Sequence, residues 1–317
     1  MSHICQMWFL SVFAKWRASA SRLGHWALNT PSLALIILLV EFSKITLVGV
    51  GLLGGSIGLA VKQRGLSGHV CGLVRREDSI SECINAGVVD EATLDTATAI
   101  EDAKLVILCT QVGQMQALSE QLKPHLADDA IVTDVGSVKG GIVSKARETL
   151  AEKISSFVPG HPIAGTEKNG VEASLEDLFV GHRVILTPLK ETSLKAHKLI
   201  TQMWESVGAE VVDLDVEHHD EVLAATSHLP HMLAYALVDC LAGMQERDEI
   251  FKYAAGGFAD FTRIASSSPD MWHDICFSNR EQLVRTLEIF STHINHIKKA
   301  IEKSESDELL KVFRRAK

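Results

Sequence analysis

The 317-residue chain lacks the cysteine patterns of metal sites and disulfide frameworks. Its cysteines have no C-x-x-C or metal-ligand spacing, and several lie within apolar runs. Buried free thiols are typical of a reducing compartment, so the sequence favours a cytoplasmic protein. Internal repeats and low-complexity tracts are absent as well. The six cysteines are Cys5, Cys71, Cys83, Cys109, Cys240 and Cys276.

Signals for a membrane span or a nucleic-acid partner are also missing. The apolar run from Leu33 to Val40 is far shorter than the ~20 residues that span a bilayer. Glu41-Phe42 after it is a poor cleavage site for a signal peptide. Residues 1–43 are therefore interpreted as a non-essential extension outside the folded core. The net charge of -9 argues against nucleic acid, because a binding face would need clustered Lys and Arg.

A dinucleotide-binding pattern follows this extension. The stretch VGVGLLGGS, residues 48–56, has G-x-G-x-x-G spacing. In such a turn the first glycine allows a sharp bend, the second lets the backbone approach a pyrophosphate, and the third lets a helix pack on the sheet. A β-rich run precedes it, residues 56–64 read as a helix, and residues 69–74 are again β-rich. This βαβ context predicts cofactor contacts at Gly49, Gly51, Leu52, Leu53 and Gly54.

The end of the second strand indicates which dinucleotide is bound. NAD sites usually carry Asp or Glu there, where the carboxylate binds the ribose hydroxyls. Here Arg75 and Arg76 follow the strand, and a guanidinium suits the 2′-phosphate of NADP. NADP is therefore the expected cofactor. NAD stays open as the alternative, because the two arginines could be solvated and Glu77 could contact the ribose.

Apolar runs and helical stretches alternate up to about residue 215. This alternation predicts an α/β domain with a Rossmann-type, doubly wound parallel sheet over residues 44–215. Thr110, at the end of one strand, is expected beside the cofactor. Residues 216–317 read as helix after helix, which predicts an all-helical domain for substrate binding and dimerisation. Further strands are expected at 103–110, 130–136, 155–159, 183–189 and 209–214, and helices at 112–122, 140–153, 193–207, 229–244 and 282–303.

Two candidate catalytic residues follow strands of this sheet, where the ligands of doubly wound sheets bind. His161 stands between Gly160 and Pro162, a rigid turn expected to hold the imidazole in place. Alcohol oxidation needs a fixed imidazole beside a nicotinamide, because the hydroxyl proton must leave as hydride departs from the same carbon. Ser137 is placed to hydrogen-bond the same hydroxyl, or the imidazole.

The helical half adds candidates for substrate binding. His228 and His231 are three residues apart, so they share a face if they lie on one helix. This spacing resembles a metal pair, but no further Cys, His or acid completes a ligand set, so no metal is predicted. Both are expected to line the cleft between the domains. Arg263 is either an ion-pair partner of a nearby acid such as Asp260 or a clamp for a substrate carboxylate.

Six motifs, taken in order, resemble the prephenate/arogenate dehydrogenase family of tyrosine biosynthesis. They run from about Lys44 almost to the C-terminus, and their order makes the resemblance highly specific. It implies a Rossmann domain, a helical domain that forms a homodimer, and oxidative decarboxylation of a cyclohexadienol with NAD(P). The motifs are VGVGLLGGS, LCT, TDVGSVK, HPIAGTEKNG, TSHLPH and GGFADFTRIA.

The resemblance also implies roles for single residues. His161 matches the catalytic histidine that hydrogen-bonds the ring hydroxyl of the substrate, and Ser137 matches the serine that supports it. Arg263 resembles the arginine that grips a substrate carboxylate. His231 matches a histidine of the substrate pocket, and Glu167 an acid at its entrance. Prephenate and arogenate, which differ by a keto group against an ammonium, both stay open as substrates.

Two other functions stay open beside this one. The first is another NADP-dependent reductase, of the 6-phosphogluconate or β-hydroxyacid dehydrogenase type. Such an enzyme would place a lysine base on a helix of the second domain, and no lysine stands out there. The second is a non-enzymatic, NADP-sensing protein. It would predict loss of His161, Ser137 or Arg263, and all three are present.

Overall fold

The computed structural model of the chain describes residues 41–166, 168–245, 247–253 and 256–317. Phe42 is 5% exposed and belongs to the hydrophobic core. Its amide donates to the carbonyl of Leu66, and its own carbonyl accepts from the amide of Gly68. The folded part therefore begins slightly before the expected boundary at residue 44. Residues 1–40 of the expected extension lie outside the described residues.

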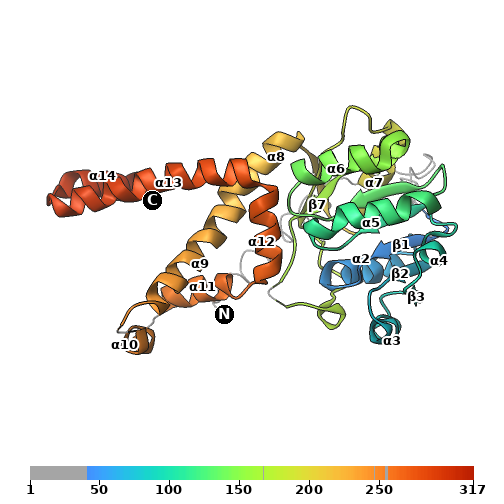
Figure 1. Ribbon diagram of the computed structural model, residues 1–317, viewed down its shortest axis with the longest axis horizontal. Helices are drawn as coiled ribbons and strands as arrows, with labels where there is room; N and C mark the ends of the chain where they lie inside the picture. Colours follow the sequence, from blue (N-terminus) through green and yellow to red (C-terminus); the bar gives the residue numbers. More distant parts are fainter. Residues whose placement is uncertain (1–40, 167, 246, 254–255) are drawn as a thin grey trace, which may run out of the picture. The chain divides into compact units, whose positions relative to one another are not determined.

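The central sheet has six parallel strands: β1 (Ile45–Val48), β2 (Val70–Leu73), β3 (Glu91–Thr93), β4 (Leu105–Leu108), β5 (Ile131–Asp134) and β6 (Phe157–Val158). Their order is β3-β2-β1-β4-β5-β6, so the chain changes direction across the sheet between β1 and β4. Figure 1 shows β1, β2 and β3 side by side. Every residue of β1, β2, β4 and β5 is buried, as expected for parallel strands covered on both faces. This is the predicted Rossmann-type sheet, whose ligands bind at the point where the strand order reverses.

Helices cover both faces of this sheet. Successive residues of β1 point to opposite faces, so Leu47 lies in one core and Val48 in the other. The first core includes side chains of α2 (Leu52–Gln63), α3 (Glu77–Asn85) and α7 (Leu194–Ser206). The second includes side chains of α4 (Thr96–Ile100), α5 (Met115–Leu122) and α6 (Gly140–Leu150). Short 3-10 turns η1 (Val112–Gln114), η2 (Lys123–His125), η3 (Ala151–Ser156) and η4 (Val171–Ala173) complete the connections.

A second, three-stranded sheet follows the first. It consists of β7 (Gly160–Pro162), β8 (Arg183–Leu186) and β9 (Glu210–Asp213). β7 is antiparallel to β8, and β8 is parallel to β9. The strands expected at 183–189 and 209–214 therefore exist but do not extend the parallel sheet. Only Pro159 separates β6 from β7, so the new sheet starts directly at the carboxyl end of β6.

The remaining chain is helical, as predicted. Its elements are α8 (Val216–Leu223), the π-helical turn η5 (Ala224–His228), α9 (Leu229–Ala242), α10 (Arg247–Lys252), α11 (Gly256–Ala265), α12 (Pro269–Ser278), α13 (Arg280–Glu302) and α14 (Ser306–Ala316). These helices bury few side chains within the chain: in α13 the described buried residues are Leu283 and Ala300. Large apolar surfaces of the helical region thus stay exposed.

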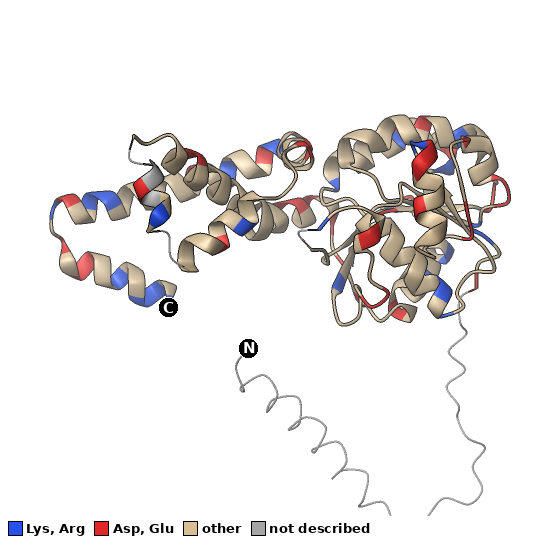
Figure 2. Ribbon diagram, turned by 90° about the horizontal axis from the view of Figure 1, so that it is seen from below, with Lys and Arg blue, Asp and Glu red and all other residues tan. Residues whose placement is uncertain are grey.

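Acidic and basic side chains are interspersed over the described elements (Figure 2). Several form exposed ion pairs, such as Lys104 with Asp129 at 2.7 Å, each of which contributes at most about 1 kcal/mol. Among the helices that the structure describes, none has the length and apolarity that crossing a bilayer requires.

Candidate active site

Three glycines shape the turn from β1 into α2. Gly49 has a φ of +87°, a conformation that favours glycine, and a Cβ there would lie 2.5 Å from Thr110 Cγ2. A Cβ on Gly54 would lie 2.4 Å from the carbonyl oxygen of Gly49, so the helix approaches the turn closely only with glycine. Gly51 has open space beside it. The three positions fit the bend, the helix contact and the ligand approach expected of a dinucleotide turn.

A cleft of about 940 Å³ lies beside this turn, along the carboxyl ends of β1, β2 and β4. Leu52 and Leu53 form the start of α2, where Gly51 supplies no side-chain cap. Their amides are therefore available to an anion, and the helix dipole favours negative charge there. The expected cofactor residues that line the cleft are Gly49, Gly51, Arg75, Arg76 and Thr110.

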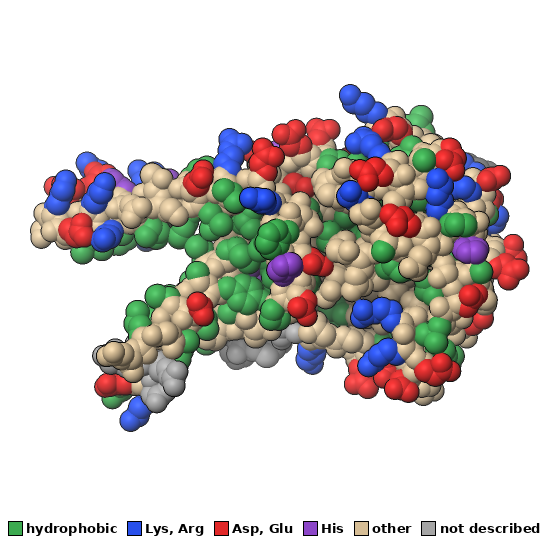
Figure 3. Space-filling view, viewed as in Figure 1, with side chains coloured by type: hydrophobic (Ala, Val, Ile, Leu, Met, Phe, Trp, Pro, Cys, Tyr) green, Lys and Arg blue, Asp and Glu red, His purple; other side chains and the backbone are tan. Residues whose placement is uncertain are grey.

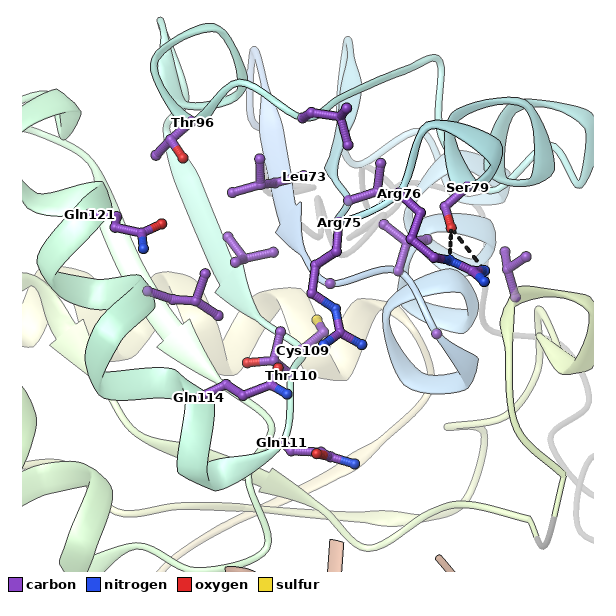
Figure 4. A pocket seen from close by; sticks show the side chains of 18 of the residues that line it. Leu73, Arg75, Arg76, Ser79, Thr96, Cys109, Thr110, Gln111, Gln114 and Gln121 are labelled. Atoms are coloured by element: carbon purple, nitrogen blue, oxygen red, sulfur yellow. Dashed lines mark hydrogen bonds between the residues drawn. The ribbon is translucent and has the colours of Figure 1, made fainter. Parts of the chain in front are cut away.

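The side chains of the two arginines of the cleft point in different directions. Arg75 extends into the cleft, whereas Arg76 turns toward Ser79 (Figure 4). The Arg76 guanidinium donates to Ser79 Oγ at 3.3 Å and to Glu82 Oε2 at 3.4 Å. Since Arg76 is thus drawn toward α3, Arg75 is the guanidinium more available to a ligand in the cleft.

Thr110 provides a further sign of a ligand. Its Oγ1 is buried and has no hydrogen-bond partner among the described residues. Buried hydroxyls are almost always hydrogen-bonded, so this one suits a polar atom of a bound molecule. Together with the helix amides and Arg75, the cleft offers donors for phosphates and hydroxyls. The residues present therefore fit a nicotinamide dinucleotide.

His161 lies at the middle of β7, not in a turn as expected from its neighbours Gly160 and Pro162. Its backbone pairs with Ile185 of β8, and its side chain is 9% exposed. The expectation of a rigid turn was wrong because strand pairing, which local sequence does not reveal, holds this segment extended. The expected consequence, an imidazole in a fixed position, still follows, since a buried strand is at least as rigid as a turn.

A chain of buried hydrogen bonds holds the His161 ring. His161 Nδ1 lies 2.9 Å from His219 Nε2, and His219 Nδ1 lies 2.8 Å from Asp220 Oδ1. His219 and Asp220 are both buried in α8. The carboxylate of Asp220 also accepts hydrogen bonds from the backbone amides of Lys139 and Gly140, each at 2.8 Å. The helical region thus supplies the partner that orients a ring carried by the α/β region.

These bonds determine where the protons lie. Burial opposes the charge on Asp220, but hydrogen bonds from His219, Lys139 and Gly140 lower the pKa of its carboxyl group. The carboxylate can only accept, so His219 donates from Nδ1 and, when neutral, accepts at Nε2. His161 must then donate from Nδ1. Its Nε2 has no hydrogen-bond partner among the residues that the structure describes and is left as an acceptor, the form a general base requires.

Burial keeps His161 itself uncharged. Desolvation is the largest cause, and unfavourable electrostatic interactions with His219, Lys139 and His228 add to it; together they lower the pKa of His161 well below its usual value of 6.5. The imidazole is therefore neutral at pH 7 and can accept a proton from a substrate. A base with a low pKa forms an unstable imidazolium when it accepts the proton. The hydrogen-bond chain through His219 to Asp220 can stabilise this positive charge.

His228 lies on the π-helical turn η5 and is fully buried. The side-chain amide of Asn279 donates to the carbonyl of Asp220 at 2.8 Å and lies 3.2 Å from His228 Nδ1. His228 therefore carries its proton on Nε2, which has no hydrogen-bond partner among the described residues. Burial lowers the pKa of His228 to about 4, so this group is a neutral donor. π-Helical turns are rare and occur mostly at functional sites.

His231 and Arg263 are less enclosed. His231 stacks on Trp272 with ring centroids 3.8 Å apart, and its Nδ1 donates to the carbonyl of Ser227 at 2.9 Å. Arg263 is exposed on α11, and no ion pair joins it to Asp260, which lies on the same helix. The nearby Arg263 charge contributes, after burial, to a lowered pKa of His231. An ion pair with Asp260 is thus not seen, and the part of the chain that the structure describes shows no other carboxylate paired with the Arg263 guanidinium.

The other expected site residues are placed as follows. Ser137 is half-buried after β5 and makes no hydrogen bond with His161. Glu167 lies outside the described residues. Within the described part of the chain, no group of three or more His, Cys, Asp and Glu side chains is arranged to hold a metal ion.

His219, Asp220 and Asn279 were missed in the sequence. The segment VEHHDEV is rich in charge and reads as a solvated helix face. A signal was nevertheless present: Val216, His219 and Leu223 follow the three-to-four-residue spacing of a buried helix face. The structure buries His219 and Leu223 and packs Val216 against the core. A histidine on an apolar helix stripe, followed by an acid, indicates a buried polar pair.

Comparison with known proteins agrees with this geometry. A family model for the nucleotide-binding domain of prephenate dehydrogenase matches residues 57–213, and one for its dimerization domain matches residues 215–315. The chain belongs to the prephenate dehydrogenase family. The two matched segments meet between β9 and α8, where the structure changes from α/β to helical.

Curated and solved relatives support this family membership. A cyclohexadienyl dehydrogenase of Zymomonas mobilis is 36% identical over 86% of this chain and 93% of its own length. The prephenate dehydrogenase of Aquifex aeolicus, solved with hydroxyphenyl propionate and NAD+, is 40% identical, with a TM-score of 0.81 over 86% of this chain and 96% of that one. An arogenate dehydrogenase of Synechocystis is 30% identical, with a TM-score of 0.73 over the same shares.

Family membership decides between the functions left open by the sequence. The chain is a dehydrogenase of this family, and its nucleotide-binding domain takes a nicotinamide cofactor. A reductase of the 6-phosphogluconate or β-hydroxyacid dehydrogenase type is not favoured. A non-enzymatic sensor is not favoured either.

Proposed function

We propose that this prephenate dehydrogenase family member oxidises and decarboxylates prephenate or arogenate, with NADP as its preferred hydride acceptor. The observation that carries the proposal is the buried chain from Asp220 through His219 to His161. It leaves a free acceptor on a neutral, fixed imidazole. This imidazole follows β6, at the same carboxyl edge of the sheet as the strand ends that line the cofactor cleft.

His161 is the general base of the proposed reaction. Its Nε2 accepts the proton of the substrate's ring hydroxyl as hydride leaves the same carbon. When bound, the cofactor supplies the nicotinamide carbon that takes up this hydride. The positive charge that develops on His161 is stabilised through His219 by the carboxylate of Asp220. Ser137 supports the hydroxyl from the neighbouring strand end.

The remaining site residues hold the substrate. Oxidation gives a dienone, and aromatisation drives loss of its ring carboxylate as carbon dioxide, so the protein need only position the ring. Arg263 offers an exposed guanidinium for a carboxylate, and the Nε2 proton of His228 offers a buried neutral donor. Neutral His231 offers an acceptor at Nε2, which suits the ammonium of arogenate. Glu167 is proposed as an acid at the entrance. We therefore expect arogenate to be accepted.

Initial rates of reduced-cofactor formation test the function. The purified full chain is assayed with prephenate and arogenate, each paired with NAD and with NADP. Turnover is expected with at least one substrate, with a higher kcat/KM for NADP than for NAD. Absence of turnover in all four pairs, from folded protein that still binds dinucleotide, would reject the proposed reaction.

Arg75→Ala is expected to remove the preference for NADP. A guanidinium paired with a phosphate contributes about 1.5–3 kcal/mol, so KM for NADP should rise about 10- to 100-fold. KM for NAD should hardly change, because NAD has no 2′-phosphate. Steady-state kinetics with both cofactors measure this difference. Arg183→Ala, which removes an exposed arginine paired with Glu210, is the matched control. Equal effects on both cofactors would contradict the assignment.

The helical domain is proposed to form a homodimer. It leaves several large apolar side chains exposed on α12, α13 and α14, and Figure 3 shows hydrophobic side chains gathered over this region. Apolar surface of this extent is typical of an interface between subunits. The exposed residues are Phe277, Val284, Ile289, Ile294, Ile301, Leu310 and Phe313.

A further inference from the structure

Lys139 and Asp134 form an ion pair in which both side chains are fully buried. Lys139 precedes α6 and Asp134 ends β5. Moving two charges out of water costs several kcal/mol per ion, and their attraction often does no more than offset that cost. A buried ion pair is thus weak evidence for stability. Its position in the molecule has to be explained in another way.

The pair binds both polar groups of Gly160, the residue immediately before His161. Lys139 Nζ donates to the Gly160 carbonyl at 2.7 Å and also to Asp134 Oδ2. Asp134 Oδ1 accepts the Gly160 amide at 3.2 Å. The backbone packs closely here, because a Cβ on Gly160 would lie 3.0 Å from the carbonyl oxygen of Asp134. Neither end of this residue can shift without breaking a buried, charge-assisted bond.

Lys139 also reaches His161 by a second route. Its backbone amide donates to Asp220 Oδ1 at 2.8 Å, the same oxygen that accepts from His219 Nδ1. His219 in turn contacts the His161 ring. One residue therefore connects the backbone before His161 with the hydrogen-bond chain behind its ring.

We propose that the buried Lys139–Asp134 pair is a positioning device that fixes the His161 imidazole for proton transfer. The proposal rests on the proposed role of His161 as the general base. Among the described residues the charged atoms of the pair make no hydrogen bond to the His161 side chain, so the pair acts through Gly160 and Asp220.

The ammonium group has an electrostatic consequence as well. The titratable groups around His161 are Asp134 of β5, Lys139 before α6, His219 and Asp220 of α8, and His228 of η5. After burial and His219, the charge of Lys139 helps to lower the pKa of His161. Loss of that charge should therefore make His161 easier to protonate. A rise in the His161 pKa would not be expected if the pair only supported the fold, so this pKa distinguishes the two roles.

Lys139→Met tests the proposal, because methionine keeps most of the apolar stem without the ammonium. A misplaced base costs up to about 100-fold, so kcat is expected to fall about 10- to 100-fold. KM for the substrate and Kd for the dinucleotide should stay within about twofold. The acid limb of the plot of kcat/KM against pH should move to higher pH. Lys145→Met, at an exposed lysine of α6 paired with Glu148, is the control and should match the unmodified protein.

Two further measurements keep the proposal open to refutation. If Lys139→Met unfolds, the double variant Asp134→Asn/Lys139→Met, which leaves no unpaired buried charge, takes its place. Histidine-labelled protein gives the His161 pKa by NMR without any turnover. Unchanged kcat and His161 pKa in the folded variant, or a double variant that cannot fold, would overturn the proposal. An inactive unmodified protein with a shifted His161 pKa in the variant would instead reject the proposed function and leave the positioning intact.

Discussion

His161→Ala is expected to lower kcat about 10²- to 10⁴-fold, the usual contribution of a positioned general base. The hydroxyl proton then has no acceptor when hydride leaves, and water cannot replace a buried, oriented nitrogen. Dinucleotide affinity should stay unchanged, since His161 does not line the cofactor cleft. Stopped-flow or steady-state kinetics give kcat, and fluorescence titration gives the cofactor Kd.

The pH profile of the unmodified enzyme is a second test of His161 as the general base. His161 must be neutral to act as a base, so kcat/KM falls as pH drops through its pKa. Because burial lowers that pKa, the acid limb is expected well below pH 6.5. His182→Ala, at an exposed histidine before β8, is the control and should leave both kcat and the limb in place. A His161→Ala enzyme within about tenfold of normal kcat would remove this residue from the role of base.

Local sequence predicts the turn from β1 into α2 well, because the geometry of this turn depends on backbone shape. Gly49, Gly51 and Gly54 follow from the steric needs of one turn, and the structure shows the bend at Gly49 and the close helix contact at Gly54. The parallel strands were found for a similar reason, since burial on both faces demands continuous apolar runs. The start of α2 was placed too late, at Ser56 rather than Leu52, because glycines obscure a helical pattern.

Local sequence predicts the catalytic half only in part, because its key contacts join segments far apart in the chain. His161 and His219 are separated by 58 positions, and Lys139 and Asp220 by 81. No spacing rule connects such residues. The separate sheet of β7 to β9 was missed for the same reason, since strand pairing depends on partners and not on the strand itself.

Asp220→Asn is expected to lower kcat about 10²- to 10⁴-fold, although the substitution is nearly isosteric. Three donors surround this carboxylate: His219 Nδ1 and the amides of Lys139 and Gly140. An asparagine has a single oxygen for these three donors, and where its NH₂ faces His219 it cannot accept, so His219 must carry its proton on Nε2 instead. His161 Nδ1 then has to accept a hydrogen bond from His219 Nε2, and His161 Nε2 carries the proton of the ring and becomes a donor. The base is present but in the wrong tautomer.

Two observations together decide whether this explanation holds for Asp220→Asn. Nitrogen chemical shifts of labelled histidine should show His161 protonated on Nε2 rather than Nδ1, while thermal melting and dinucleotide Kd confirm a folded protein. His218→Ala, at the exposed neighbour of His219 on α8, should leave kcat and tautomer unchanged. A folded Asp220→Asn enzyme with normal kcat would show that the proton on His161 is not set by this chain. A large loss of kcat with the normal tautomer would mean that the carboxylate acts by its charge on the imidazolium, and not by directing protons.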